Sequence, residues 1–137
     1  MPLNLHQAAM NATELVAAVD LGSNSFRMLV AQVVKTPSGT QLRPIDTLRE
    51  SVRLAAGLTD NKLLGNDAYR RGIAAIRRFG ERIRGFDPAN VRAVATNTLR
   101  VAKNAPHFIR EAEEALGFPI EVIAGVEEAR LIYRSEE

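Results

Sequence analysis

The residues whose types and spacing best suit chemistry lie between Asp20 and Ser25, in a polar stretch between two apolar runs. Gly22 has no side chain, so its backbone can approach a ligand closely. Groups that can donate hydrogen bonds to an anion follow at Ser23, Asn24 and Ser25. Asp20, at the end of the first apolar run, is placed to hold a divalent cation directly or through water. A carboxylate beside a donor-rich loop is what a metal–phosphate site requires.

The same stretch can also be interpreted as an ordinary polar hairpin. The apolar runs at 16–19 and 26–34 are typical of buried strands. Two to five residues with turn chemistry suffice to join such strands. On this interpretation Asn24 and Ser25 only shape the turn, and the loop alone does not decide between the two.

Composition restricts the class of protein. The 137 residues, 46% hydrophobic and 25% charged, suit one globular domain. The net charge of +2 gives no indication of a nucleic-acid or membrane partner. The lack of cysteine excludes disulfides and thiolate metal sites, and it fits a cytoplasmic protein. No apolar run approaches the ~20 residues of a membrane span. Residues 1–13 lack the features of a signal peptide and are expected to form a flexible leader.

Hydrophobic periodicity predicts five strands and three helices in the remaining chain. Strands are expected at 14–20, 26–34, 41–50, 91–96 and 120–123. Helices are expected at 67–84, 105–116 and 126–133. Three strands joined by short turns form an antiparallel meander, and the strand–helix alternation that follows gives parallel crossovers. This order predicts an α/β fold with a mixed sheet flanked by helices.

Unusual residues gather where three of the predicted strands end. These ends are Asp20, Thr96 and Ala124. In open sheets of this kind, ligands bind outside the carboxyl ends of strands where the connections diverge. We therefore expect Asp20, Thr96 and Gly125 to lie at one end of the sheet, in a single site.

Four motifs occur in a fixed order along the chain: DLGSNSF from Asp20, VRLAAGL from Val52, ATNTLR from Ala95 and VIAGVEEARLIY from Val122. In these motifs the chain resembles the exopolyphosphatase / guanosine pentaphosphate phosphohydrolase family, and the resemblance extends over nearly everything after the first dozen residues. That family belongs to the actin, sugar kinase and Hsp70 superfamily. The resemblance implies a ribonuclease H-like lobe with strand order 3-2-1-4-5, in which the second strand is antiparallel.

The resemblance implies an exopolyphosphatase that hydrolyses terminal phosphoanhydride bonds of inorganic polyphosphate with Mg²⁺ or another divalent cation. Guanosine pentaphosphate (pppGpp) is the alternative substrate, because these motifs look alike in both activities. The EEARLI stretch argues against a kinase-like phosphotransferase of the same superfamily. An alternative of another class is a non-catalytic nucleotide- or alarmone-binding module.

The resemblance also implies the roles of individual residues. The loop from Gly22 to Ser25 would bind phosphate together with Arg53, Thr98 and Arg100. A guanidinium group can contact phosphate bidentately. For Arg100 the alternative is a solvated helix residue.

A carboxylate that orients or deprotonates water is also needed. Of two adjacent glutamates, Glu128 corresponds to the proposed catalytic base of the family. On the alternative interpretation, Glu127 and Glu128 only complement the N-terminus of a helix.

The complete enzymes of the family are longer than this chain. They carry a second lobe of similar fold with another phosphate loop, and no such motif occurs in these 137 residues. Residues 14–137 are therefore expected to form the first of two lobes and to carry half of a site. For the full-length protein the resemblance implies a homodimer.

One further feature is the arginine-rich side of the helix expected at 67–84. Its apolar residues recur every three or four positions, as on one buried face. The arginines on the rest of its surface are Arg70, Arg71, Arg77, Arg78 and Arg82. They form either a solvated face or a surface that attracts polyanions.

Overall fold

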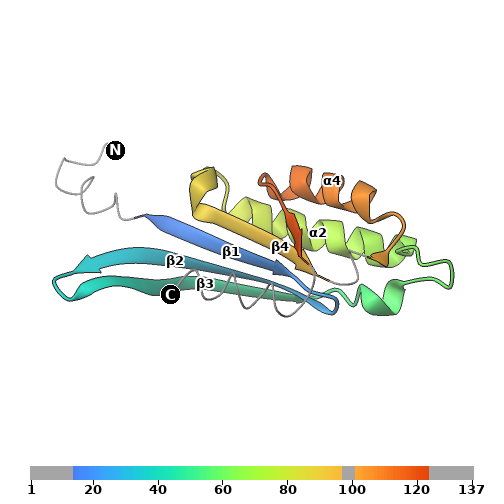
Figure 1. Cartoon of the computed structure of the whole chain (residues 1–137), viewed down its shortest axis with the longest axis horizontal. Helices are drawn as coiled ribbons and strands as arrows, with labels where there is room; N and C mark the ends of the chain where they lie inside the picture. Colours follow the sequence, from blue (N-terminus) through green and yellow to red (C-terminus); the bar gives the residue numbers. More distant parts are fainter. Residues whose placement is uncertain (1–13, 97–100, 124–137) are drawn as a thin grey trace.

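The computed structural model describes residues 14–96 and 101–123. A five-stranded sheet has the strand order β3-β2-β1-β4-β5 (Figure 1). The strands are β1 (Leu15–Leu21), β2 (Ser25–Thr36), β3 (Gly39–Ser51), β4 (Val91–Thr96) and β5 (Glu121–Ile123). The helices are α2 (Asn66–Arg82) and α4 (Ala105–Leu116), with short 3₁₀ turns η1 (Ala55–Gly57) and η2 (Pro88–Asn90). β2 is antiparallel to both β1 and β3, whereas β4 is parallel to β1 and β5. The predicted strand order and mixed sheet are confirmed.

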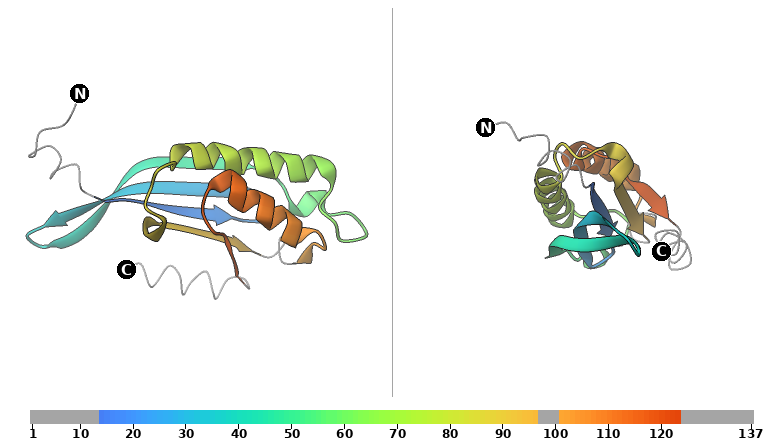
Figure 2. Two further views of the ribbon diagram at one scale, coloured as in Figure 1. Left: turned by 90° about the horizontal axis from the view of Figure 1, so that it is seen from above. Right: turned by 90° about the vertical axis from the view of Figure 1, so that its left-hand side faces the viewer.

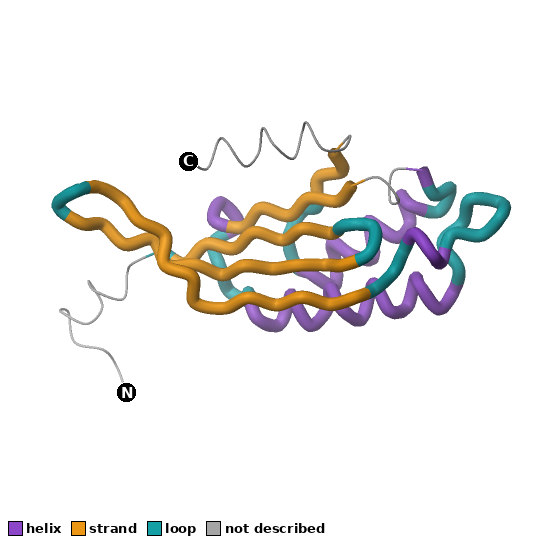
Figure 3. Tube along the Cα trace, turned by 90° about the horizontal axis from the view of Figure 1, so that it is seen from below, coloured by secondary structure: helices purple, strands orange, loops and turns teal. Residues whose placement is uncertain are grey.

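The β2–β3 hairpin is longer than the predicted strands at 26–34 and 41–50. Only Pro37 and Ser38 lie between the two strands. So short a turn is possible because Gly39 adopts a φ of 133°, a conformation that is strained for residues with a side chain. The tip of this hairpin extends beyond the other strands (Figure 3). Residues 39–45 of β3 are all exposed, so the alternation of burial that marks a half-buried strand is absent there.

The two helices cover one face of the sheet (Figure 2). Alternate residues of β1 point toward them, so Ala17, Val19 and Leu21 are buried in the core. Asp20 lies between two of these residues and therefore points to the opposite face. The period of two thus places the candidate metal ligand on the side of the sheet away from α2 and α4.

Helices α2 and α4 pack closely against each other. A Cβ atom at Gly80 would lie 2.5 Å from the carbonyl oxygen of Ala115, and one at Gly72 would lie 2.9 Å from the ring of Phe108. Phe79 and Phe108 are completely buried in the same core. This packing is part of the single core between the helices and the buried face of the sheet.

Candidate functional site

The β1–β2 turn is a tight loop at the carboxyl end of β1. The strand register pairs Leu21 with Phe26, which leaves Gly22 to Ser25 to reverse the chain. The amide of Gly22 donates to the carbonyl oxygen of Ser25 at 3.1 Å, and a Cβ atom at Gly22 would lie only 3.1 Å from that oxygen. Glycine at this position permits the close approach that shapes the loop.

The segment that follows β3 is hydrogen-bonded to this turn. The amides of Val52 and Arg53 both donate to the carbonyl oxygen of Asn24, each at 2.9 Å. The amide of Ala55 donates to the carbonyl oxygen of Ser23 at 3.0 Å. These three bonds join two motifs that are about thirty residues apart in the sequence, so the structure brings Arg53 beside the loop.

Arg53 has an unusual backbone conformation. Its φ of 49° lies in the left-handed region, which costs a residue with a side chain about 1–2 kcal/mol. The residues on either side, Val52 and Leu54, are buried in the core, whereas Arg53 itself is exposed. Such a conformation persists only where the surroundings hold it, and it is typical of functional sites.

Asp20 lies opposite Arg27 across the β1–β2 pair. Partial burial of the carboxyl group raises the pKa of Asp20, and the positive charge of Arg27 opposes this effect. A divalent cation near Asp20 would act in the same direction as Arg27, because it favours the ionised carboxylate. Within the described residues, no cluster of three or more His, Cys, Asp or Glu side chains could hold a metal. A cation bound at Asp20 would therefore need most of its oxygen ligands from elsewhere.

Part of the predicted site falls at the expected edge of the sheet. Leu21 lies beside Ala95 and Thr96 lies beside Ile123, so the carboxyl ends of β1, β4 and β5 meet there. The other predicted members lie outside the described residues: Thr98, Arg100, Gly125 and Glu128. The structure thus brings Asp20, the Gly22–Ser25 loop and Arg53 together, and it does not test the rest.

The arginine-rich side of α2 is used largely for contacts with β3. Arg78 forms an ion pair with Glu50 and holds the pKa of that carboxyl below its ordinary value through its hydrogen bond. Arg82 pairs with Asp46 at 2.6 Å. Arg71 donates to the carbonyl oxygen of Val52, at 3.1 Å from Nη2 and 3.4 Å from Nε. From the sequence we expected these arginines either to be solvated or to attract polyanions. No sequence pattern indicates that a helix side chain will bind the backbone at the end of a distant strand.

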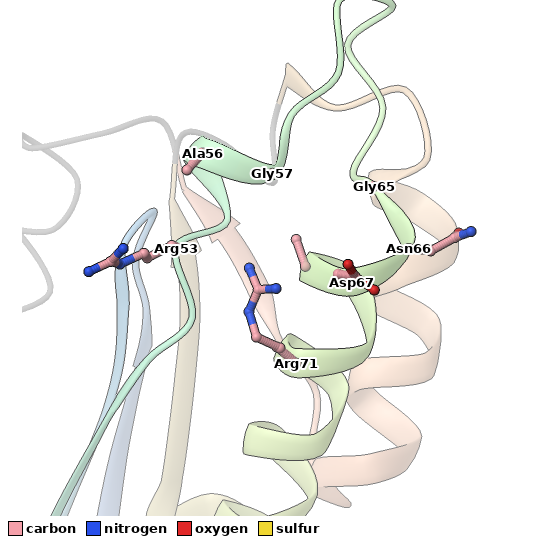
Figure 4. Close-up of a pocket in the computed structure, with 8 residues that line it drawn as sticks. Arg53, Ala56, Gly57, Gly65, Asn66, Asp67 and Arg71 are labelled. Atoms are coloured by element: carbon pink, nitrogen blue, oxygen red, sulfur yellow. The ribbon is translucent and has the colours of Figure 1, made fainter.

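One cavity lies beside this region, and another lies at the opposite end of β1. The first, of about 530 Å³, lies between the 53–57 segment and the start of α2, and it is lined by Arg53, Asp67 and Arg71 among others. In Figure 4 the Arg71 side chain points into this space, whereas that of Arg53 points away from it. The second cavity, about 320 Å³, is mostly apolar and is lined by Val16, Leu29 and Val91 among others, at the start of β1 and β4. The guanidinium of Arg53 thus lies outside the larger cavity.

The topology, with two helices against one face of the 3-2-1-4-5 sheet, defines a ribonuclease H-like lobe of the actin, sugar kinase and Hsp70 superfamily. The chain belongs to the Ppx/GppA phosphatase family, whose model matches residues 29–135. Among the described residues, no helix is both long enough and apolar enough to cross a membrane.

Solved structures of this family have the same fold. A PPX-GPPA enzyme of Aquifex aeolicus is 30% identical with a TM-score of 0.70, over 81% of this chain and 36% of its own. An exopolyphosphatase-like protein is 31% identical with a TM-score of 0.70, over 85% of this chain and 34% of its own. An exopolyphosphatase from Cytophaga hutchinsonii, at 22% identity, has a TM-score of 0.74 over 88% of this chain and 38% of its own. The chain therefore spans little more than a third of the length of these structures.

Proposed function

We propose that this chain is the first lobe of an exopolyphosphatase, which removes the terminal phosphate of inorganic polyphosphate. The observation that carries the proposal is the joining of the Gly22–Ser25 loop to Arg53 by three backbone hydrogen bonds, at the sheet edge that Asp20 shares. Family membership supports hydrolysis of a phosphate ester or anhydride bond. The length of the related structures supports a second lobe that completes the site.

The chemistry of the proposal follows from charge and position. Hydrolysis of a phosphoanhydride by an in-line water depends mostly on holding the phosphate and stabilising its negative charge. The loop offers hydroxyl and amide donors, and Arg53 offers a charged donor that exceeds a neutral one in strength. In the proposal these groups hold the terminal phosphates, and Glu128 positions the water or takes its proton.

A divalent cation such as Mg²⁺ fits this donor set. Mg²⁺ is usually bound by one or two carboxylates together with substrate phosphates and water, and Asp20 is one such carboxylate. When bound, the cation would supply positive charge against the phosphate oxygens. Asp20 would hold it on the face of the sheet away from the helices, with the remaining ligands provided by substrate and solvent.

The test is release of inorganic phosphate by two proteins, the 137-residue chain alone and the same chain joined to its second lobe. We expect the two-lobed protein to release phosphate from polyphosphate faster than from pppGpp, and the isolated chain to release little from either. The isolated chain would lack the donors of the second lobe. Its own charges would face water, which weakens their interaction with the phosphate.

The outcomes separate the alternatives. Efficient turnover by the isolated chain would refute the two-lobe proposal. Faster turnover of pppGpp than of polyphosphate by the two-lobed protein would make the alarmone the substrate. Binding of both compounds without release of phosphate would instead favour the non-catalytic module.

A further inference from the structure

We infer that Arg71 is a positioning residue, which holds the peptide between Val52 and Arg53 so that the Arg53 side chain is presented beside the Gly22–Ser25 loop. The inference rests on the proposed function, because phosphate binding by Arg53 is part of that proposal. It adds a residue on α2 that would act on the site only through another residue.

The first observation is that the Arg71 guanidinium donates its hydrogen bonds to a backbone oxygen. Nη2 and Nε donate to the carbonyl oxygen of Val52 at 3.1 and 3.4 Å. Asp67 lies one helical turn earlier on α2, at a spacing that suits an ion pair. In the described part of the chain, Arg71 nevertheless makes no ion pair within 4.0 Å and reaches instead toward the end of β3 (Figure 4).

The second observation is that the same peptide unit is held at its other end. Its carbonyl belongs to Val52 and its amide to Arg53. The amide donates to the carbonyl oxygen of Asn24 at 2.9 Å. Helix α2 therefore holds the oxygen of this peptide and the β1–β2 turn holds its nitrogen, which fixes the orientation of the peptide plane.

The orientation of this peptide determines φ of Arg53, which is 49°. An L-residue left free would return to a negative φ. The chain on both sides cannot shift to accommodate such a rotation, because Val52 and Leu54 are only 2% and 0% exposed. Rotation of the peptide is thus the remaining freedom, and the bond from Arg71 opposes it. If the peptide rotated, the amide of Arg53 would turn away from the carbonyl oxygen of Asn24, and the hydrogen bond that ties Arg53 to the loop would be lost.

The first experiment measures amide hydrogen exchange of the Arg53 backbone in the absence of any ligand. Arg71→Met keeps the length of the side chain and removes its donors, whereas Arg71→Lys can still donate one hydrogen bond. Arg70→Met is the matched control, because Arg70 is an exposed arginine on the same helix that makes no side-chain hydrogen bond or ion pair to any described residue. We expect amide hydrogen exchange of Arg53 to accelerate in Arg71→Met, less in Arg71→Lys and not in Arg70→Met. Unchanged exchange in Arg71→Met would overturn the inference whatever the protein binds.

The second arm measures affinity of the 137-residue chain for inorganic tripolyphosphate by titration calorimetry. Arg71→Met should weaken binding about 5- to 30-fold, because the competent backbone conformation becomes less populated. In the Arg53→Gly background the same change should have no further effect, since the side chain that Arg71 positions is gone. Additive losses in the double variant would overturn the inference. Equal affinities of wild type and Arg53→Gly would refute phosphate binding by Arg53, and the exchange experiment would still decide whether Arg71 holds the peptide.

Discussion

Replacing Glu128 by glutamine should lower kcat of the proposed two-lobed enzyme by about 10²–10⁴-fold, or roughly 3–5 kcal/mol in the barrier. Glutamine keeps the size and hydrogen bonding of the side chain but is not a base. The affinity for polyphosphate should change little, because removal of a negative charge near phosphates does not weaken their binding. Steady-state kcat and independently measured substrate affinity separate the two effects.

Glu127→Gln is the matched control, one residue earlier in the same motif. A carboxylate that only complements a helix N-terminus is worth about 0.3–1 kcal/mol, so this variant should be close to wild type in kcat. Small and equal losses in both variants would show that the pair serves only a helix end. A large loss confined to Glu127→Gln would assign the base to the other glutamate.

Removing the side chain of Arg53 should weaken binding of tripolyphosphate about 10- to 150-fold, since hydrogen bonds to charged groups are worth about 1.5–3 kcal/mol. Arg53→Gly is the informative change, because glycine adopts the left-handed φ of 49° without strain. The backbone bonds to Asn24 can then remain, and the loss of affinity reports on the guanidinium alone. Calorimetric titration of both proteins measures the difference.

Arg53→Ala separates the side chain from the backbone. Alanine lacks the guanidinium as glycine does, but its Cβ atom is strained at a positive φ. The free energy of unfolding of Arg53→Ala should therefore be about 1 kcal/mol lower than that of Arg53→Gly. Urea-induced unfolding compares the two. If both variants bound tripolyphosphate as tightly as wild type, Arg53 would have no part in the site.

The sequence predicts the fold well because the fold depends on local patterns. Alternation along β1 and the 3.6-residue period of α2 each require only a short window. The predicted and observed elements differ mainly where the apolar pattern does not reflect burial. Residues 39–45 of β3 are exposed on both faces, and helix α2 ends at Arg82, two residues before the predicted end.

The site is less predictable because it depends on contacts between distant segments. The DLGSNSF motif indicates an anion loop, and the VRLAAGL motif indicates an arginine. Neither indicates that the carbonyl oxygen of Asn24 accepts from the amide of Arg53, or that φ of Arg53 is positive. The role inferred for Arg71 is invisible for the same reason, since its partner is a backbone oxygen 19 residues away. A periodicity plot shows that residue only as one of several arginines on a polar face.

Binding of phosphate groups at the Gly22–Ser25 loop beside Arg53 can be tested directly by amide chemical shifts. The ¹⁵N-labelled chain would be titrated with tripolyphosphate in the presence of Mg²⁺, and then with the anion alone. We expect the largest shift changes at the amides of Gly22, Ser23, Asn24 and Arg53, and we expect them to saturate at lower tripolyphosphate concentration when Mg²⁺ is present. Changes confined to the exposed arginines of α2, such as Arg70 and Arg77, would contradict binding at the loop and show only a general attraction of polyanions to positive charge.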